Sequence, residues 1–215
     1  AAGMTPERGA ALFTRSDGSF QFARWGRPLA PVVFGTDDAT LDIFKDAIRA
    51  VAGLGDLSLT DTDPELGVNL PVFVVPDWAE LAEVPHLGEL IPDLGALLPR
   101  LQAADANQYR SFRFDEAGAI RLCVILLRND ANLQAASAQT VATAQMAQSM
   151  LLWSDTAFSD ESPVALLPEG AAIVRPQIAA LIRAAYDPVL PAASQEPALA
   201  HRLAARAGLL LGDLE

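Results

Sequence analysis

Hydrophobic residues along the chain follow two periods, one expected of strands and one of helices. The short apolar runs that predict strands are 32–34, 57–60, 70–75 and 120–127. Both alternating faces of 70–75 are apolar, so this strand is expected to be covered on both sides, with Pro71 at its start or at an unpaired position. Between residues 41 and 51 the apolar spacing becomes three and four, which predicts a helix ending near Gly53 or Gly55.

Two turns that contain aspartate and glycine predict β-hairpins. The first, Ser16-Asp17-Gly18, separates 11–15 from 19–25, and the second, Asp115 to Gly118, lies inside 109–127. The return strand of the second hairpin is the most apolar stretch of the chain and is expected near the centre of the core. Between the two hairpins, 76–107 consists of short helical pieces broken by prolines, and it is expected to be an insertion packed on the sheet.

A segment without charged residues, from Ala131 to Trp153, predicts a central helix over about 133–152. It is long enough to cross a bilayer, but its many Asn, Gln, Ser and Thr side chains argue against a membrane span. An irregular stretch is expected over 153–170. A helix starting near Pro176 and a last helix over 196–211 complete the chain.

Together these elements predict an α+β fold, in which a small mixed or antiparallel sheet packs against the central uncharged helix and C-terminal helices. We expect a single domain over residues 1–215, since this length suits one substantial core, with 76–107 as a possible helical insertion. Hydrophobic residues make up 51% of the chain, enough to offset the chain entropy lost on folding.

Charge and motif content exclude several classes of function. The net charge is −12 and no Lys/Arg-rich run is present, so nucleic acid is not an expected partner. The chain has only two histidines, His86 and His201, and neither has the histidine partner that zinc sites commonly use. The serine-elbow and phosphate-binding glycine motifs are absent. We therefore expect no catalytic residues, no metal ligands and no cofactor.

The single cysteine, Cys123, lies in the apolar run of the second hairpin and is expected to be a small buried hydrophobe. One cysteine allows no internal disulfide, so the cysteine count leaves the cellular compartment open. The sequence begins Ala1-Ala2-Gly3 without an export signal, which is compatible with a cytoplasmic protein or with a mature exported one.

Several segments together suggest a family resemblance. They are Arg24-Trp25, Leu122–Leu127, Ala144-Gln145-Met146-Ala147-Gln148, Met150–Asp155 and Ala184-Ala185-Tyr186-Asp187-Pro188. With the order of the elements, they resemble a family of uncharacterised, exported proteobacterial proteins that look related to zincins, the zinc metallopeptidases whose central helix carries H-E-x-x-H. The resemblance covers about residues 20–195. It implies a zincin-like fold and a periplasmic or cell-envelope location, with a cytoplasmic location as the alternative.

The metal-binding window departs from that family. It reads Ala144-Gln145-x-x-Gln148, and neither the alanine nor the glutamine amides can replace zinc ligands. Gln145 also cannot accept a proton near neutral pH. The resemblance therefore implies a vestigial cleft lined by Ala144, Gln145, Gln148 and Asp155, and a non-catalytic binding or interaction protein with an unknown protein or peptide partner.

Other interpretations stay open. Asp160 and Glu161 could form the carboxylate pair of a metal-independent hydrolase, or a degenerate metallopeptidase could retain activity. A structural subunit would expose an apolar patch around Leu209–Leu211. Finally, Gln145 and Gln148 could simply be polar residues hydrogen-bonded within a helical protein.

Overall fold

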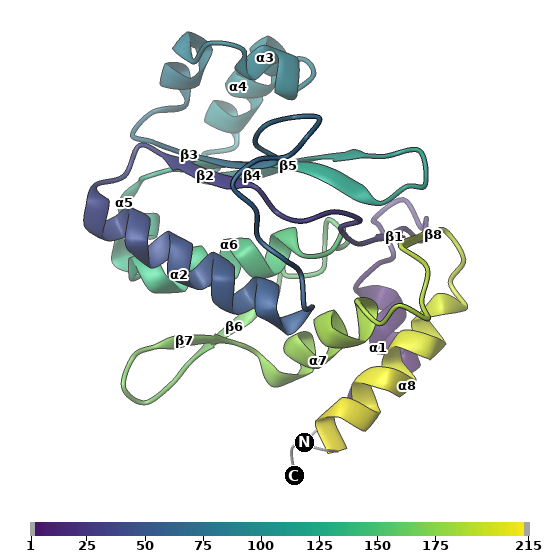
Figure 1. The fold of residues 1–215 in the computed structure, drawn as a ribbon. Helices are drawn as coiled ribbons and strands as arrows, with labels where there is room; N and C mark the ends of the chain where they lie inside the picture. Colours follow the sequence, from purple (N-terminus) through teal and green to yellow (C-terminus); the bar gives the residue numbers. More distant parts are fainter. Residues whose placement is uncertain (1–2, 213–215) are drawn as a thin grey trace.

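A four-stranded mixed sheet organises the chain in the computed structural model, which describes residues 3–212 (Figure 1). The strands lie in the order β2 (Pro31–Phe34), β3 (Leu70–Val75), β5 (Ile120–Arg128) and β4 (Gln108–Phe114). The first three are parallel, and β4 is an antiparallel edge strand paired with β5. The fold is α+β, as the sequence predicts.

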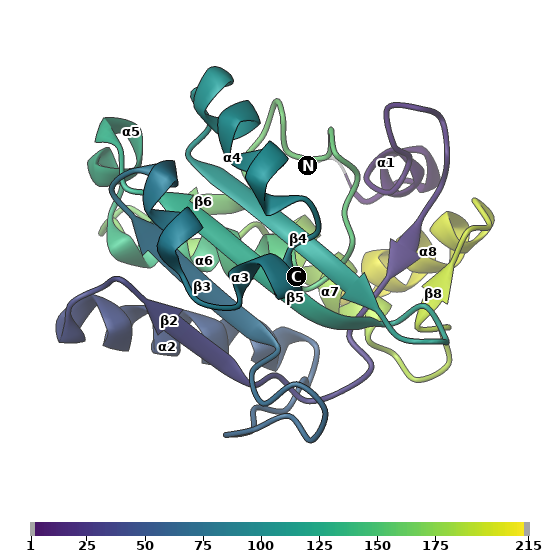
Figure 2. The same ribbon diagram turned by 90° about the horizontal axis from the view of Figure 1, so that it is seen from above.

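Helices cover both faces of this sheet (Figures 1 and 2). One face packs on α2 (Asp38–Leu54) and α6 (Ala138–Ser149), and the other on η1 (Trp78–Glu83), α3 (Leu87–Leu90) and α4 (Leu94–Ala103). Alternate residues of β5 therefore enter separate cores: Cys123, Ile125 and Leu127 enter the first, and Leu122, Val124 and Leu126 the second. All six are buried, which explains why this strand is the most apolar stretch of the chain.

The remaining elements surround the α2/α6 side. They are α1 (Pro6–Ala11), β1 (Phe22–Ala23), α5 (Ala131–Ala135), β6 (Val164–Leu166), β7 (Ala172–Val174), α7 (Pro176–Ala185), β8 (Ala193–Ser194) and α8 (Leu199–Gly212). Helix α8 packs on α1 and α7, β1 pairs with β8, and β6 with β7 (Figure 1). No helix within residues 3–212 is both long and apolar enough to span a bilayer.

Local signals in the sequence account for the elements that were predicted correctly. Asp37 accepts a hydrogen bond from the Thr40 N–H and begins α2. Pro71 pairs only toward β2, because pairing of β3 with β5 begins at Val72 and the missing proline N–H is not needed there. The second hairpin turns at Asp115, whose carboxylate accepts from backbone N–H groups of the turn.

The predicted continuous helix over 133–152 was wrong. Ser137 has an extended backbone (φ −65°, ψ 151°) and starts a new helix. Its Oγ accepts a hydrogen bond from the Thr140 N–H, three residues further on. The segment is therefore divided into α5 and α6. Helix α6 ends at Ser149, and Leu151 forms a β-bridge with Arg24.

Four other expectations need correction. The first hairpin turns at 16–18 as predicted, with a backbone hydrogen bond from the Arg15 N–H to the Ser19 carbonyl, but its arms share a single bridge, Thr14 with Phe20. They are shorter than expected because Thr5 and Pro6 start a helix that extends to Ala11. The run 57–60 forms one bridge rather than a strand. The stretch 153–170 is not wholly irregular, since β6 lies within it and pairs with β7. The last helix begins at Leu199 rather than at 196, and within it Leu209 is exposed whereas Leu210 and Leu211 pack on the core.

Candidate functional site

The residues of the predicted vestigial cleft lie on two neighbouring segments. Ala144, Gln145 and Gln148 lie on α6, and Asp155 follows this helix in the connection to β6. Gln145 is buried with 4% of its surface exposed, Ala144 and Gln148 are half-buried, and Asp155 is exposed. The structure brings Gln145 and Gln148 onto one side of α6, facing strand β4.

A residue that the sequence interpretation missed, Arg110 of β4, meets these glutamines. Its Nη1 donates to Oε1 of Gln145 at 2.8 Å and to Oε1 of Gln108 at 3.1 Å. Its Nη2 donates to Oε1 of Gln148 at 2.8 Å. Gln145 Nε2 in turn donates to Gln108 Oε1 at 2.8 Å, so the three side chains, called here the glutamine cluster, form one network around the guanidinium.

Arg110 has no carboxylate partner among the described residues, where every ion pair involves other arginines or His86. Burial lowers its pKa from the ordinary value of arginine, since the charged form is desolvated. Arginine still carries its charge near neutral pH, so the cation is held by amide oxygens alone. The glutamine cluster satisfies three of the five guanidinium N–H groups, leaving Nε–H and one Nη2–H without an acceptor within residues 3–212.

Arg110 lines a cavity of about 390 Å³ between β4 and the segment that follows α6. It is lined by polar, charged, aromatic and aliphatic residues: Arg15, Gln108, Tyr109, Arg110, Phe112, Gln148, Leu152, Trp153, Ser154, Asp155, Phe158 and Ser159. A neighbouring cavity of about 330 Å³ is lined by Ala144, Gln145 and the segment 158–164. The two cavities share Gln108, Gln148, Phe158 and Ser159, so they lie on either side of the glutamine cluster.

Asp155 is held rigidly at the wall of the larger cavity. Its Oδ1 accepts from the Ser16 N–H at 3.0 Å and from Ser154 Oγ at 3.2 Å, and its Oδ2 accepts from Ser16 Oγ. These hydrogen bonds, those from Ser16 first, lower the pKa of Asp155, with a smaller contribution from the charge of Arg15. The cavity is therefore lined by a half-buried cation, Arg110, and by an ionised carboxylate, Asp155.

The proposed carboxylate pair is not assembled. Asp160 and Glu161 are both exposed and both line the smaller cavity, but no hydrogen bond joins them in the described chain. Glu161 instead forms ion pairs with Arg8 at 3.5 Å and with Arg175 at 3.3 Å. Glu161 therefore connects α1 to the β6–β7 hairpin through ion pairs, and it does not form a general acid and base pair with Asp160.

Other chemically active groups are placed away from reactive geometry. Cys123 is fully buried, and this burial raises the pKa of its thiol to about 12, which leaves it protonated and a poor nucleophile. His86 and His201 are exposed, and Nδ1 of His86 lies 3.3 Å from Oε1 of Glu89. Within residues 3–212 no three His, Cys, Asp or Glu side chains are grouped to hold a metal ion.

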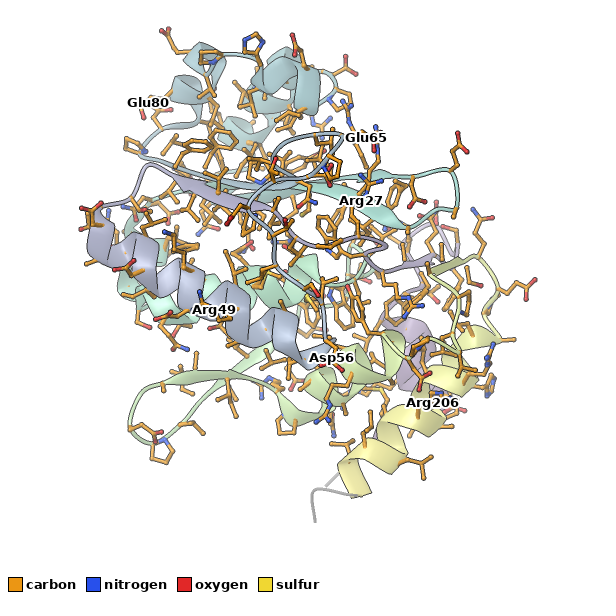
Figure 3. The ribbon with its side chains drawn as sticks, viewed as in Figure 1. Arg27, Arg49, Asp56, Glu65, Glu80 and Arg206 are labelled. Atoms are coloured by element: carbon orange, nitrogen blue, oxygen red, sulfur yellow. The ribbon has the colours of Figure 1, made fainter. Side chains whose placement is uncertain are left out.

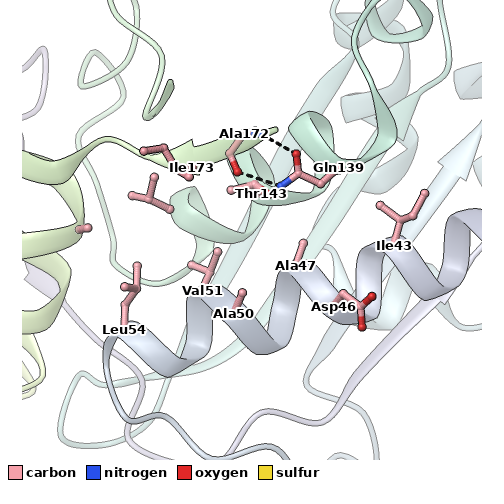
Figure 4. Close-up of a pocket in the computed structure, with 12 residues that line it drawn as sticks. Ile43, Asp46, Ala47, Ala50, Val51, Leu54, Gln139, Thr143, Ala172 and Ile173 are labelled. Carbon is pink, nitrogen blue, oxygen red and sulfur yellow. Dashed lines mark hydrogen bonds between the residues drawn. The ribbon is translucent and has the colours of Figure 1, made fainter. Parts of the chain in front are cut away.

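A separate cavity of about 460 Å³ lies between α2, α6 and β7 (Figure 4). Its walls are mostly aliphatic, and Asp46 is the one ionisable residue that lines it. Gln139 fixes β7 over α6, because its amide donates to the Ala172 carbonyl at 2.8 Å and accepts from the Ala172 N–H at 2.7 Å. This cavity does not include any predicted site residue.

Comparisons of the chain with protein-family models, with curated proteins and with solved structures give no match. The site is therefore interpreted from its own geometry.

Proposed function

We propose that this chain is a non-catalytic binding domain, on a scaffold similar to the zincins, whose cleft binds a small ligand through a carboxylate. The observation that carries the proposal is Arg110, a cation placed between β4 and α6 with amide partners only. Arg110 is half-buried at the cavity wall and lacks a carboxylate partner there, so an anionic ligand that enters the cavity gains a charge-assisted hydrogen bond.

The free donors of Arg110 fit that ligand. Nε–H and one Nη2–H can lie along one edge of the planar guanidinium. In this arrangement they can donate two parallel hydrogen bonds to the two oxygens of a carboxylate. The glutamine cluster accepts the other three N–H groups and holds the guanidinium in place before a ligand arrives. Preorganisation of this kind lowers the cost of ordering on binding.

The lack of catalysis is supported by the same residues. Gln145 and Gln148 use their carbonyl oxygens on Arg110, so these atoms are already engaged in hydrogen bonds to a cation. The zincin resemblance rests on the sequence segments named above, together with a mixed sheet that packs on α6. It also favours a periplasmic or cell-envelope location, which fractionation of the source cells would test.

Calorimetric titration with 3-phenylpropanoate tests the binding proposal, because this probe combines a carboxylate with an apolar body. We expect saturable binding by the wild-type protein and its loss in Arg110→Gln. The matched control is Arg113→Gln, since Arg113 lies on the same strand but bonds to the Glu89 carbonyl on the opposite face of the sheet. Equal binding by wild type and Arg110→Gln would contradict the proposal.

The non-catalytic part is tested separately by metal analysis and a peptidase assay. Protein purified without chelator should contain no stoichiometric zinc and should not cleave peptides. Stoichiometric zinc together with chelator-sensitive peptidase activity would refute it.

A further inference from the structure

The cavity beside Arg110 carries a second charge of opposite sign. Asp155 lines the same cavity of about 390 Å³. An ionised carboxylate offers about four acceptor positions, and Asp155 uses three of them, two on Oδ1 and one on Oδ2. One position on Oδ2 is therefore left for a donor in the cavity.

Part of the cavity wall is apolar. Phe112 of β4, Leu152 and Phe158 line the cavity, and Trp153 stacks on Phe13 at 5.3 Å and meets Phe158 edge to face at 5.1 Å. These ring contacts fix the aromatic wall. A volume of about 390 Å³ is at the small end of the range for small-molecule sites.

We propose that the occupant of this cavity is a free α-amino acid with an apolar side chain. Its carboxylate pairs with the free edge of Arg110, its ammonium donates to Asp155 Oδ2, and its side chain packs against Phe112 and Phe158. The inference rests on the proposed function, since it assigns the ligand class of the same site. It adds the requirement for an ammonium group.

The alternatives differ in which charge they use. A simple carboxylic acid would pair with Arg110 and form no ion pair with Asp155. A simple amine would pair with the exposed Asp155 and form no ion pair with the half-buried Arg110, where an ion pair is worth more because it is less screened by water. A zwitterion satisfies both groups at once.

Arg15 also lines the cavity, and its positive charge contributes to the lowered pKa of Asp155. It forms no ion pair with Asp155 within 4.0 Å in the described residues. An ammonium group therefore does not have to displace an existing salt bridge.

Three probes with the same phenyl body separate these cases: L-phenylalanine, 3-phenylpropanoate and 2-phenylethylamine. Calorimetric titration of the full chain should rank L-phenylalanine about tenfold above 3-phenylpropanoate, the gain expected for one charge-assisted hydrogen bond. 2-Phenylethylamine should bind more weakly than either. Asp155→Asn should reduce the preference for L-phenylalanine over 3-phenylpropanoate to less than about threefold, because the ammonium loses its charged partner.

The possible negative results of these titrations contradict different proposals. Equal binding of L-phenylalanine and 3-phenylpropanoate by the wild type would overturn the amino-acid assignment and leave the carboxylate site standing. Binding of none of the three probes would overturn both proposals. Asp155→Asn also loses part of its contact with Ser16, so its thermal unfolding is recorded beside the titration; the wild-type ranking carries the test if this variant does not fold.

Discussion

Arg110 on the edge strand and Gln148 on α6 are 38 positions apart in sequence, yet they are joined by a hydrogen bond of 2.8 Å. This bond and the one to Gln145 connect the edge strand to α6. The two glutamines thus hold a cation that belongs to the chain itself, the guanidinium of Arg110.

Replacing Arg110 with methionine should lower the free energy of unfolding by about 1–3 kcal/mol, because the amide oxygens of the buried Gln145 and the half-buried Gln148 lose their donor. Chemical denaturation measures the change. Arg113→Met is the matched control on the opposite face of β4 and should cost less, since one hydrogen bond to the Glu89 carbonyl is lost. An Arg110→Met protein as stable as wild type would show that the network adds nothing.

The sequence singled out three residues that line the two cavities of the site but not Arg110. The zincin resemblance directed attention to Gln145, Gln148 and Asp155, and the structure places all three around a pair of adjoining cavities. The sequence did not indicate Arg110, because the position of β4 relative to α6 depends on tertiary packing. The one available signal was weak: Arg110 alternates with Phe112, so a charged side chain shares the face of an inward-pointing aromatic.

Cys123 should make the protein less stable in alkali. Burial raises the pKa of its thiol from 9.0 to about 12, so the folded protein holds this proton more tightly than the unfolded chain. The stability it contributes is complete below pH 9.0 and is lost as the pH rises toward about 12. Denaturation of wild type and Cys123→Ala between pH 8 and 11 measures this. Above pH 9 the free energy of unfolding of wild type should fall steadily relative to that of Cys123→Ala. A difference between the two proteins that stays constant with pH would contradict the expectation.

Asp63 should contribute to stability in the opposite pH range. It is 3% exposed and accepts hydrogen bonds from the N–H groups of Glu65 and Leu66 and from Asn69. Burial alone would raise its pKa, but these bonds and the charge of Arg27, which lies near Glu65 in Figure 3, outweigh burial and lower it.

The contribution of Asp63 is therefore present above pH 3.8, the ordinary pKa of aspartate, and is lost as the pH falls through the lower folded value. Asp63→Asn should be less stable than wild type at pH 7 by about 2 kcal/mol, and the difference should shrink in acid. Urea denaturation from pH 7 down to pH 2 measures both effects. A difference that stays constant over this range would show that the charge of Asp63 is irrelevant.

Arg24 should stabilise the end of α7. Its guanidinium donates to the carbonyls of Ala185, Asp187 and Leu190, the last at 2.8 Å, groups that lie at and just beyond the C-terminus of the helix. Arg24→Lys keeps the charge but cannot reach all three carbonyls. It should lower the thermal midpoint by several degrees, consistent with a loss of about 1–2 kcal/mol. An unchanged midpoint would show that charge alone suffices.

Local chemistry explains how much of the fold was predictable. Periods of two and three to four residues located β3, β5 and α2, since each buries a continuous apolar face. The break at Ser137 was not predicted, because apolar and polar residues continue across it and only the cap at Ser137 marks the boundary. Short strands such as β1 and β8 pair across more than half the chain, and no local pattern records such a partner.

The most direct test of the account is to observe the Arg110 guanidinium while a carboxylate is added. In an NMR titration of ¹⁵N-arginine-labelled protein with 3-phenylpropanoate, assigned by comparison with Arg110→Gln, the Arg110 Nε–H signal should shift saturably. Its dissociation constant should match the calorimetric value, and the Arg113 signal should stay fixed. Saturable binding that leaves the Arg110 signal unmoved would place the ligand elsewhere and contradict the central claim.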